Sequence, residues 1–191
     1  MKNNIVVSIC NDAILEAGNS ATIYSLADNS QLSELCSRLW NTTVDELYSD
    51  HTWTFRTVRT QADLVTSGSL NEYAIPDDAL RIVHFYKDAG YQVEEKLARV
   101  GAKPSGEQVI FSPHLPLFIE YTTWNTDNSA LPPLARKALT FLLAAKIATS
   151  QGKDDQKILQ KYNYWLDKAE ENDATQANKF NVNDDRFIDC R

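Results

Sequence analysis

Apolar residues recur at helical spacing along the first fifty residues, in two separate runs. The first run covers residues 5–17 and is followed by Gly18, a residue that readily adopts the left-handed conformation at the end of a helix. The second run begins after Asn29 or Ser30, either of which can cap a helix, and continues to Asp50. We therefore expect two amphipathic helices here. The second has an apolar face wide enough to contact two neighbours.

The pattern changes near Trp53, where residues typical of strands replace the helical stripe. Between residues 52 and 124 the chain is rich in Thr, Val, Tyr, Phe and Ile, and Gly and Pro interrupt it at short intervals. Such a composition predicts short strands joined by turns. We expect strands in five segments, which together form an antiparallel insert: 53–59, 80–86, 91–97, 107–111 and 117–124.

Two more helices are expected after this insert. The prolines at 132–133 suit the first turn of a helix, where the missing N–H has no cost. Residues 134–149 are apolar on nearly every face, which indicates a helix surrounded by protein. Asp154 or Asp155 can cap a last helix, which we expect to end near Ala177.

The end of the chain is more polar. The last helix loses its apolar stripe in residues 170–178, so we expect these turns to leave the body of the protein. The fold class we predict is α+β: an antiparallel bundle of about four helices, an inserted antiparallel β-domain and an extended C-terminal tail. The predicted parts are a helical core (1–52 and 129–178), a β-rich insert (53–128) and a tail (179–191).

Composition favours a globular protein without a membrane span. The most apolar stretch, residues 131–148, includes Arg136 and Lys137 and is shorter than the ~20 apolar residues that a span requires. The first residues show no long apolar run of the kind found in secretory signals. We therefore expect no contact with a membrane.

The charge balance argues against a protein that holds DNA tightly. The chain has 26 Asp and Glu against 19 Lys and Arg, a formal net charge of −7, and no basic run. Affinity for nucleic acid comes mainly from clustered basic side chains. We expect DNA that meets this protein to slide past without specific binding.

The three cysteines do not form a pattern that predicts a bridge or a metal site. Cys10, Cys36 and Cys190 are an odd number and have no CxxC spacing. Cys10 and Cys36 fall on the apolar faces of the first two helices, so we expect them in the core. Cys190 lies in the polar tail.

Candidate catalytic chemistry is sparse. The sequence has no GxSxG, HExxH, GxGxxG or GxxxxGK[ST] motif. His51, His84 and His114 are dispersed without metal-ligand spacing, which favours structural roles. Acidic pairs such as Asp77 and Asp78 lack a Gly-centred ligand loop, so we expect them to be solvated. We predict no enzymatic activity, no cofactor and no metal site.

Four segments, in this order and spacing, carry a resemblance to a known family. They are Asn11-Asp12-Ala13 with Gly18, Asp45-Glu46-Leu47 with Trp53-x-Phe55, Tyr73-x-x-Pro76 with Leu80-Arg81, and Leu131-Pro132-Pro133-Leu134. Together they resemble the tail tubular protein A, or head–tail adaptor, family of short-tailed bacteriophages and related gene-transfer particles. The chain departs from the pattern by an extra residue between Pro76 and Leu80. It also has Leu131-Pro132 where relatives often carry an aromatic and an acidic residue before the proline.

The resemblance implies a structural virion protein, made in the host cytoplasm, that forms a ring at the head–tail junction. Such a ring, usually of twelve copies, docks beneath the portal protein, surrounds the DNA exit channel and meets a tail or nozzle protein below. The C-terminal tail would enter a groove of the portal and become ordered there. The portal-binding residues we expect are Phe180, Arg186, Phe187 and Ile188.

Two other functions stay open at the level of sequence. One is a small peptide-binding or regulatory phage protein that uses the β-insert as its platform, which a monomer that never assembles with a portal would favour. The other is a metal-dependent phage enzyme, which would need a cleft with clustered carboxylates and would melt differently with divalent ions.

Overall fold

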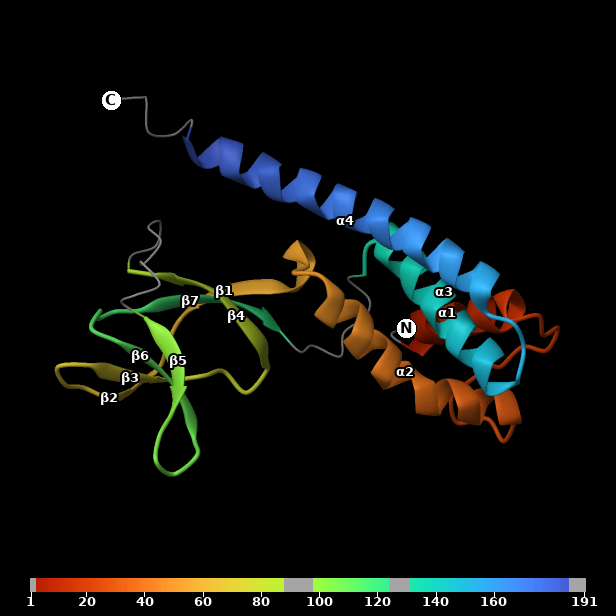
Figure 1. Cartoon of the computed structure of the whole chain (residues 1–191), viewed down its shortest axis with the longest axis horizontal. Helices are drawn as coiled ribbons and strands as arrows, with labels where there is room; N and C mark the ends of the chain where they lie inside the picture. Colours follow the sequence, from red (N-terminus) through yellow and green to blue (C-terminus); the bar gives the residue numbers. More distant parts are fainter. Residues whose placement is uncertain (1–2, 88–97, 124–130, 186–191) are drawn as a thin grey trace. The chain divides into compact units, whose positions relative to one another are not determined.

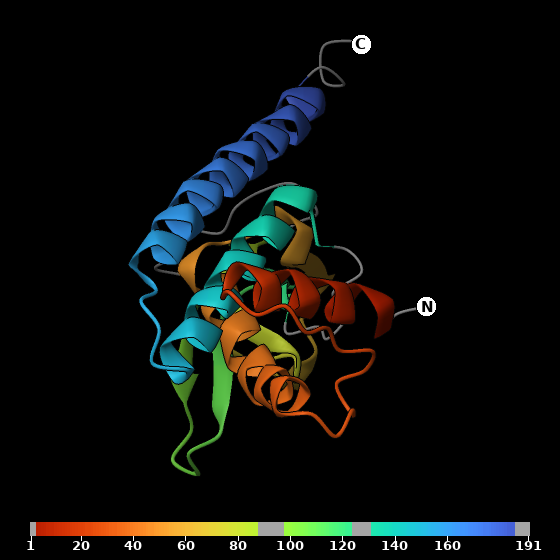
Figure 2. The ribbon, with the colours of Figure 1, turned by 90° about the vertical axis from the view of Figure 1, so that its right-hand side faces the viewer.

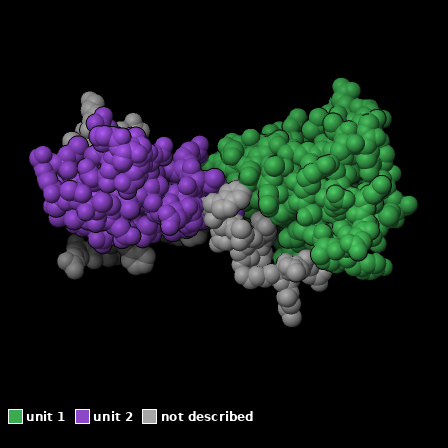
Figure 3. Space-filling model, turned by 90° about the horizontal axis from the view of Figure 1, so that it is seen from below, with its two compact units in different colours: residues 1–55, 127–191 green, residues 56–126 purple. Residues whose placement is uncertain are grey.

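A computed structural model describes residues 3–87, 98–123 and 131–185, with side chains described from residue 5 and up to residue 176. The chain folds into two compact units (Figure 3). A helical unit consists of residues 1–55 and 127–191, and a β-rich unit consists of residues 56–126. The predicted α+β fold class is confirmed by four helices and two antiparallel sheets in the described residues.

Capping residues explain where the helices begin and end. Helix α1 is Asn3–Glu16, α2 is Gln31–Asp50, α3 is Pro133–Ser150 and α4 is Gln156–Asp185 (Figure 1). The hydroxyl of Ser30 caps α2 by accepting the N–H of Ser33 at 3.2 Å. Gly18, with a φ of 76°, ends α1, and its N–H donates to the carbonyl of Leu15.

Helix α3 is the centre of the helical unit. It packs against α1, α2 and α4, and Figures 1 and 2 both show α4 running alongside it. Leu139, Leu143 and Ile147 are fully buried on it, and five of its alanines are buried as well. This arrangement confirms that the apolar run in residues 134–149 is a helix surrounded by protein.

The β-rich unit has two antiparallel sheets with one shared apolar core. The first sheet has the strand order β1 (Thr57–Gln61), β7 (Phe118–Thr123), β4 (Ala79–Tyr86). The second has the order β2 (Leu64–Thr66), β3 (Asn71–Ala74), β6 (Gln108–Ser112), β5 (Arg99–Ala102). Tyr73 and Ile110 of the second sheet lie in one cluster with Ile119 and Tyr121 of the first.

The strand predictions need correction at several places. Strands β2, β3 and β5 were not expected, because three or four residues are too few to show alternation. The strand expected at 53–59 is shorter, since a 3-10 turn, η1 (Thr54–Arg56), precedes β1. Trp53 is fully buried in the helical core, so the helical unit continues to Phe55 and does not stop at residue 52. The expected strand at 91–97 lies outside the described residues.

Helix α4 is longer than expected. It continues to Asp185, so the prediction that it ends near Ala177 is wrong, and residues 179–185 of the predicted tail are helical. No Gly or Pro occurs between Ala174 and Asp185 to stop the helix. The expectation that residues 170–178 leave the body is also wrong at Asp173, which is 5% exposed.

Candidate functional site

The residues expected to bind the portal fall at the end of the chain. Phe180 belongs to the backbone of α4, but its side chain is outside the described residues. Arg186, Phe187 and Ile188 also lie outside them, so their role stays a prediction. The structure does describe helix α4, which leads to these residues, and the contacts that attach α4 to the helical unit. We take these contacts as the candidate site.

One stripe of α4 faces the body of the helical unit. Tyr162, Leu166, Ala169 and Asp173 follow one another at intervals of four, three and four residues, the spacing of one helical face. All but the half-buried Leu166 are buried. Apolar residues thus hold the first half of α4, and a carboxylate takes the next position of the same stripe.

The first half of α4 also makes polar and cation–π contacts. Lys161 forms an ion pair of 2.7 Å with Glu16 of α1. The hydroxyl of Tyr162 donates to Asp50 at the end of α2, at 2.9 Å. Burial, and then this hydrogen bond, raise the pKa of Tyr162. The ammonium of Lys137 on α3 lies 4.1 Å from the ring centroid of Trp165.

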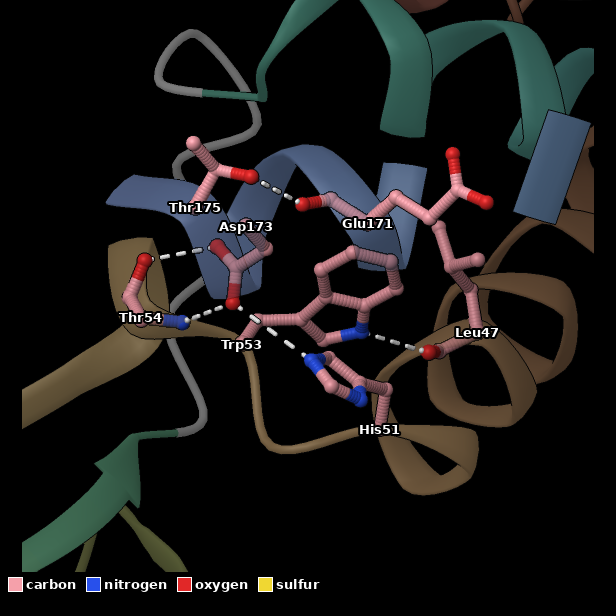
Figure 4. A network of polar contacts seen from close by, with 7 residues as sticks. All are labelled: Leu47, His51, Trp53, Thr54, Glu171, Asp173 and Thr175. Carbon is pink, nitrogen blue, oxygen red and sulfur yellow. Dashed lines mark hydrogen bonds and ion pairs between the residues drawn. The ribbon is translucent and has the colours of Figure 1, made fainter. Parts of the chain in front are cut away.

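Asp173 binds the segment that connects α2 to the first strand. Its Oδ2 accepts the backbone N–H of Thr54 at 2.9 Å, and its Oδ1 accepts the hydroxyl of Thr54 at 2.6 Å (Figure 4). The Nε2 of His51 lies 3.4 Å from Oδ2. A buried carboxylate is costly unless donors satisfy it, and here both oxygens have them. We call these three residues the Asp173 clamp.

Aromatic packing fixes the segment that the clamp holds. The indole N–H of Trp53 donates to the carbonyl of Leu47 at 2.8 Å (Figure 4). The ring of Trp53 lies 4.8 Å from that of His51 and 5.5 Å from that of Phe55, centroid to centroid. Residues 51–55, the junction segment, are therefore attached to α2 by the hydrogen bond from Trp53 and to α4 by Asp173.

The clamp does not have the geometry of a catalytic triad. In a triad the imidazole lies between the carboxylate and a hydroxyl, so that it can take the hydroxyl proton. Here the carboxylate of Asp173 lies between the imidazole of His51 and the hydroxyl of Thr54. The arrangement attaches one segment to another. In the part of the chain that the structure describes, no group of three His, Cys, Asp or Glu side chains could hold a metal ion.

The other two histidines have neighbours within the β-rich unit. His84 lies on β4 with its ring 6.2 Å from that of Tyr86, and the carbonyl of His114 accepts a hydrogen bond from Tyr73. Both histidines belong to the β-rich unit.

The acidic pair at 77–78 is less simple than expected. Asp78 accepts the hydroxyl of Thr123 at 2.6 Å and that of Tyr121 at 3.1 Å, so it is not only solvated. The bond from Thr123 contributes most to lowering the pKa of Asp78. The carboxylate has a structural role beside β7.

The cysteine predictions are confirmed for the helical core. Cys10 and Cys36 are both fully buried and are free thiols. A hydrogen bond with Cys36 and burial raise the pKa of the Cys10 thiol. Cys190 lies outside the described residues.

Sequence reasoning missed Asp173, although a signal for it existed. Tyr162, Leu166 and Ala169 lie on one face of the helix, and the next residue on that face is at position 173. An Asp at an interior position of such a stripe predicts either a surface turn or a buried, satisfied carboxylate. Only the fold, which brings Thr54 to it from 119 residues away, decides between the two.

Comparison with known proteins does not assign the site. No family model matches the chain, and no curated protein matches it either. None of the described helices is long and apolar enough to span a membrane. The observations that bear on function are the order of elements and the attachment of α4.

Proposed function

We propose that this protein is a structural virion protein, a head-to-tail adaptor. Its copies form a ring that connects the portal to the tail of a phage and surrounds the DNA exit channel. The observation that carries the proposal is α4, a 30-residue helix that is fastened as far as Asp173 and continues to Asp185. It leads toward the residues expected to enter the portal.

The organisation of the chain supports this role. A helical unit interrupted by a β-rich unit is the order of elements that the resemblance implies. Acidic residues outnumber basic ones, so a channel lined by such subunits would repel DNA and keep it mobile. Each subunit of a ring needs surfaces for two neighbouring subunits, for the portal and for the tail. In a chain with two units, different units can provide different surfaces.

A truncation of the chain tests the contact with the portal. Removal of residues 175–191 leaves Asp173 and its bonds to Thr54 in place, so the helical unit should stay folded and lose only the helical circular dichroism signal of residues 175–185. We expect this truncated chain to lose binding to the cognate portal in a pull-down assay. Portal binding by the truncated chain would refute the proposed role of the C-terminal end.

A double substitution tests whether two particular side chains bind the portal. Buried aromatic and aliphatic residues dominate interfaces of this kind, so Phe187→Ala with Ile188→Ala should weaken portal binding by at least tenfold. The matched control is Glu171→Gln, an exposed position on the same helix whose carboxylate forms an ion pair with Lys168. Equal affinity of the double variant and the control would exclude these two residues as anchors.

A further inference from the structure

Asp173 is the only buried residue among positions 170–176 of α4, the last part of the helix whose side chains are described. Glu170 is partly buried, and the other five positions are exposed. Among the described side chains of α4, Ala169 is the last buried apolar one. Through its contact with Thr54 and His51, Asp173 therefore attaches this part of the helix to the body.

The same contact holds the junction segment. Thr54 uses both its backbone N–H and its hydroxyl to bind Asp173. It is followed by Phe55, the last residue of the helical unit before the chain passes to β1. One carboxylate thus fixes two segments at once, the chain leading into the β-rich unit and the helix leading to the C-terminal end.

A polar attachment of this kind opens more easily than an apolar one. When the clamp separates, water replaces its hydrogen bonds, so the net cost is far smaller than the strength of the bonds themselves. A Leu at the same position would lose its whole burial energy. Both oxygens of the carboxylate bind Thr54, so movement of Asp173 away from Thr54 breaks both hydrogen bonds.

We infer that the part of α4 after Ala169 and the junction segment open and close as one unit, coupled through Asp173. Release of the helix exposes the amide of Thr54, and loosening of Thr54 loosens the helix, because a coupling between two sites is reciprocal. The Asp173 clamp is thus a contact that can open, and it couples the C-terminal end of the chain to the segment that leads into the β-rich unit.

Amide hydrogen exchange measured by NMR tests the coupling in both directions. In Asp173→Ala we expect the amides of Thr54 and of residues 174–176 to exchange at least tenfold faster than in the wild type. In Thr54→Val, which removes only the hydroxyl, we expect the amides of residues 174–176 to accelerate although the substitution is 119 positions from Asp173. Glu171→Gln, the control, should leave all of these rates unchanged.

Two results would overturn the inference. One is that Thr54→Val leaves the exchange of residues 174–176 at its wild-type rate, which would mean that the contact transmits nothing. The other is that the amides of α3 accelerate in Asp173→Ala by the same factor as those of α4, which would mean that the whole unit unfolds. Acceleration confined to the junction segment and the end of α4 supports it.

A second measurement, which rests on the proposed function, uses the cognate portal. Portal binding at the C-terminal end should change the exchange rate of the Thr54 amide in the wild type and have no effect on it in Asp173→Ala. The same effect in both proteins would refute transmission through Asp173. If no portal binds, the proposed function fails, and the two variants measured alone still decide the coupling.

Discussion

At the scale of single residues, the placement of one carboxylate decides how α4 is attached. Asp173 is 5% exposed, and its oxygens are satisfied by the N–H and hydroxyl of Thr54, with His51 beside them. The net contribution of its hydrogen bonds to the free energy of folding is small. Removing the carboxylate costs more, because it leaves the donors of Thr54 without an acceptor. The residue is therefore a sensitive position for stability.

Substitution of Asp173 should lower the stability of the helical unit. Asp173→Ala leaves the N–H and hydroxyl of Thr54 without their acceptor, so we expect the free energy of unfolding to fall by about 2–3 kcal/mol. Glu171→Gln, on the exposed side of the helix, should change it by less than about 0.5 kcal/mol. Urea denaturation measures both values. A change below about 0.5 kcal/mol for Asp173→Ala would contradict the structural role of the carboxylate.

A tyrosine in the β-rich unit should make the protein sensitive to alkali. Burial, followed by the hydrogen bond to Glu120, raises the pKa of Tyr86 to about 12 from the ordinary value of 10.0. Between these values the unfolded chain binds fewer protons than the folded one, so stability falls as the pH rises. Below pH 10 this contribution is fully present. Chemical denaturation from pH 9 to 12 should therefore show a steeper decline for the wild type than for Tyr86→Phe, and equal slopes would refute it.

At the scale of elements, the helices followed from sequence pattern and part of the β-rich unit did not. Periodicity, Gly18 and Ser30 are enough to place α1 and α2, and the all-round apolar run places α3. Strands β2, β3 and β5 are too short to alternate visibly, so only pairing in the fold defines them. The absence of Gly and Pro is consistent with the length of α4, but the burial of Asp173 could not be predicted, because its partner Thr54 is 119 residues away.

Two truncations separate the clamp from the rest of the helix. A chain that lacks residues 175–191 keeps Asp173, whereas one that lacks residues 173–191 loses it. We expect the melting temperature of the first to stay close to that of the full chain, and that of the second to fall by roughly 5 °C more. Differential scanning calorimetry measures the difference. Equal melting temperatures would show that α4 is held by its apolar half alone.

At the scale of the whole molecule, charge and the division into two units support an assembly role. The net charge of −7 favours solubility and disfavours attachment to phosphate. The two units each have their own apolar core, so each can present surfaces without opening the other. The proposed ring uses both properties, since subunits must meet neighbours while DNA passes.

The interaction with DNA should be correspondingly weak. At physiological salt we expect no change in the fluorescence anisotropy of a labelled duplex with up to about 100 μM protein. The physical reason is that too few clustered cations are present to release counterions from DNA. Micromolar affinity with a steep dependence on salt would contradict the proposal that DNA passes without binding.

Electron microscopy of the protein mixed with its cognate portal tests the central claim most directly. The account predicts a ring of this chain stacked coaxially on the portal ring, with the end of α4 directed into the portal and an open channel along the axis. Micrographs that show portal rings alone, with the protein remaining monomeric in the same mixture, would contradict it.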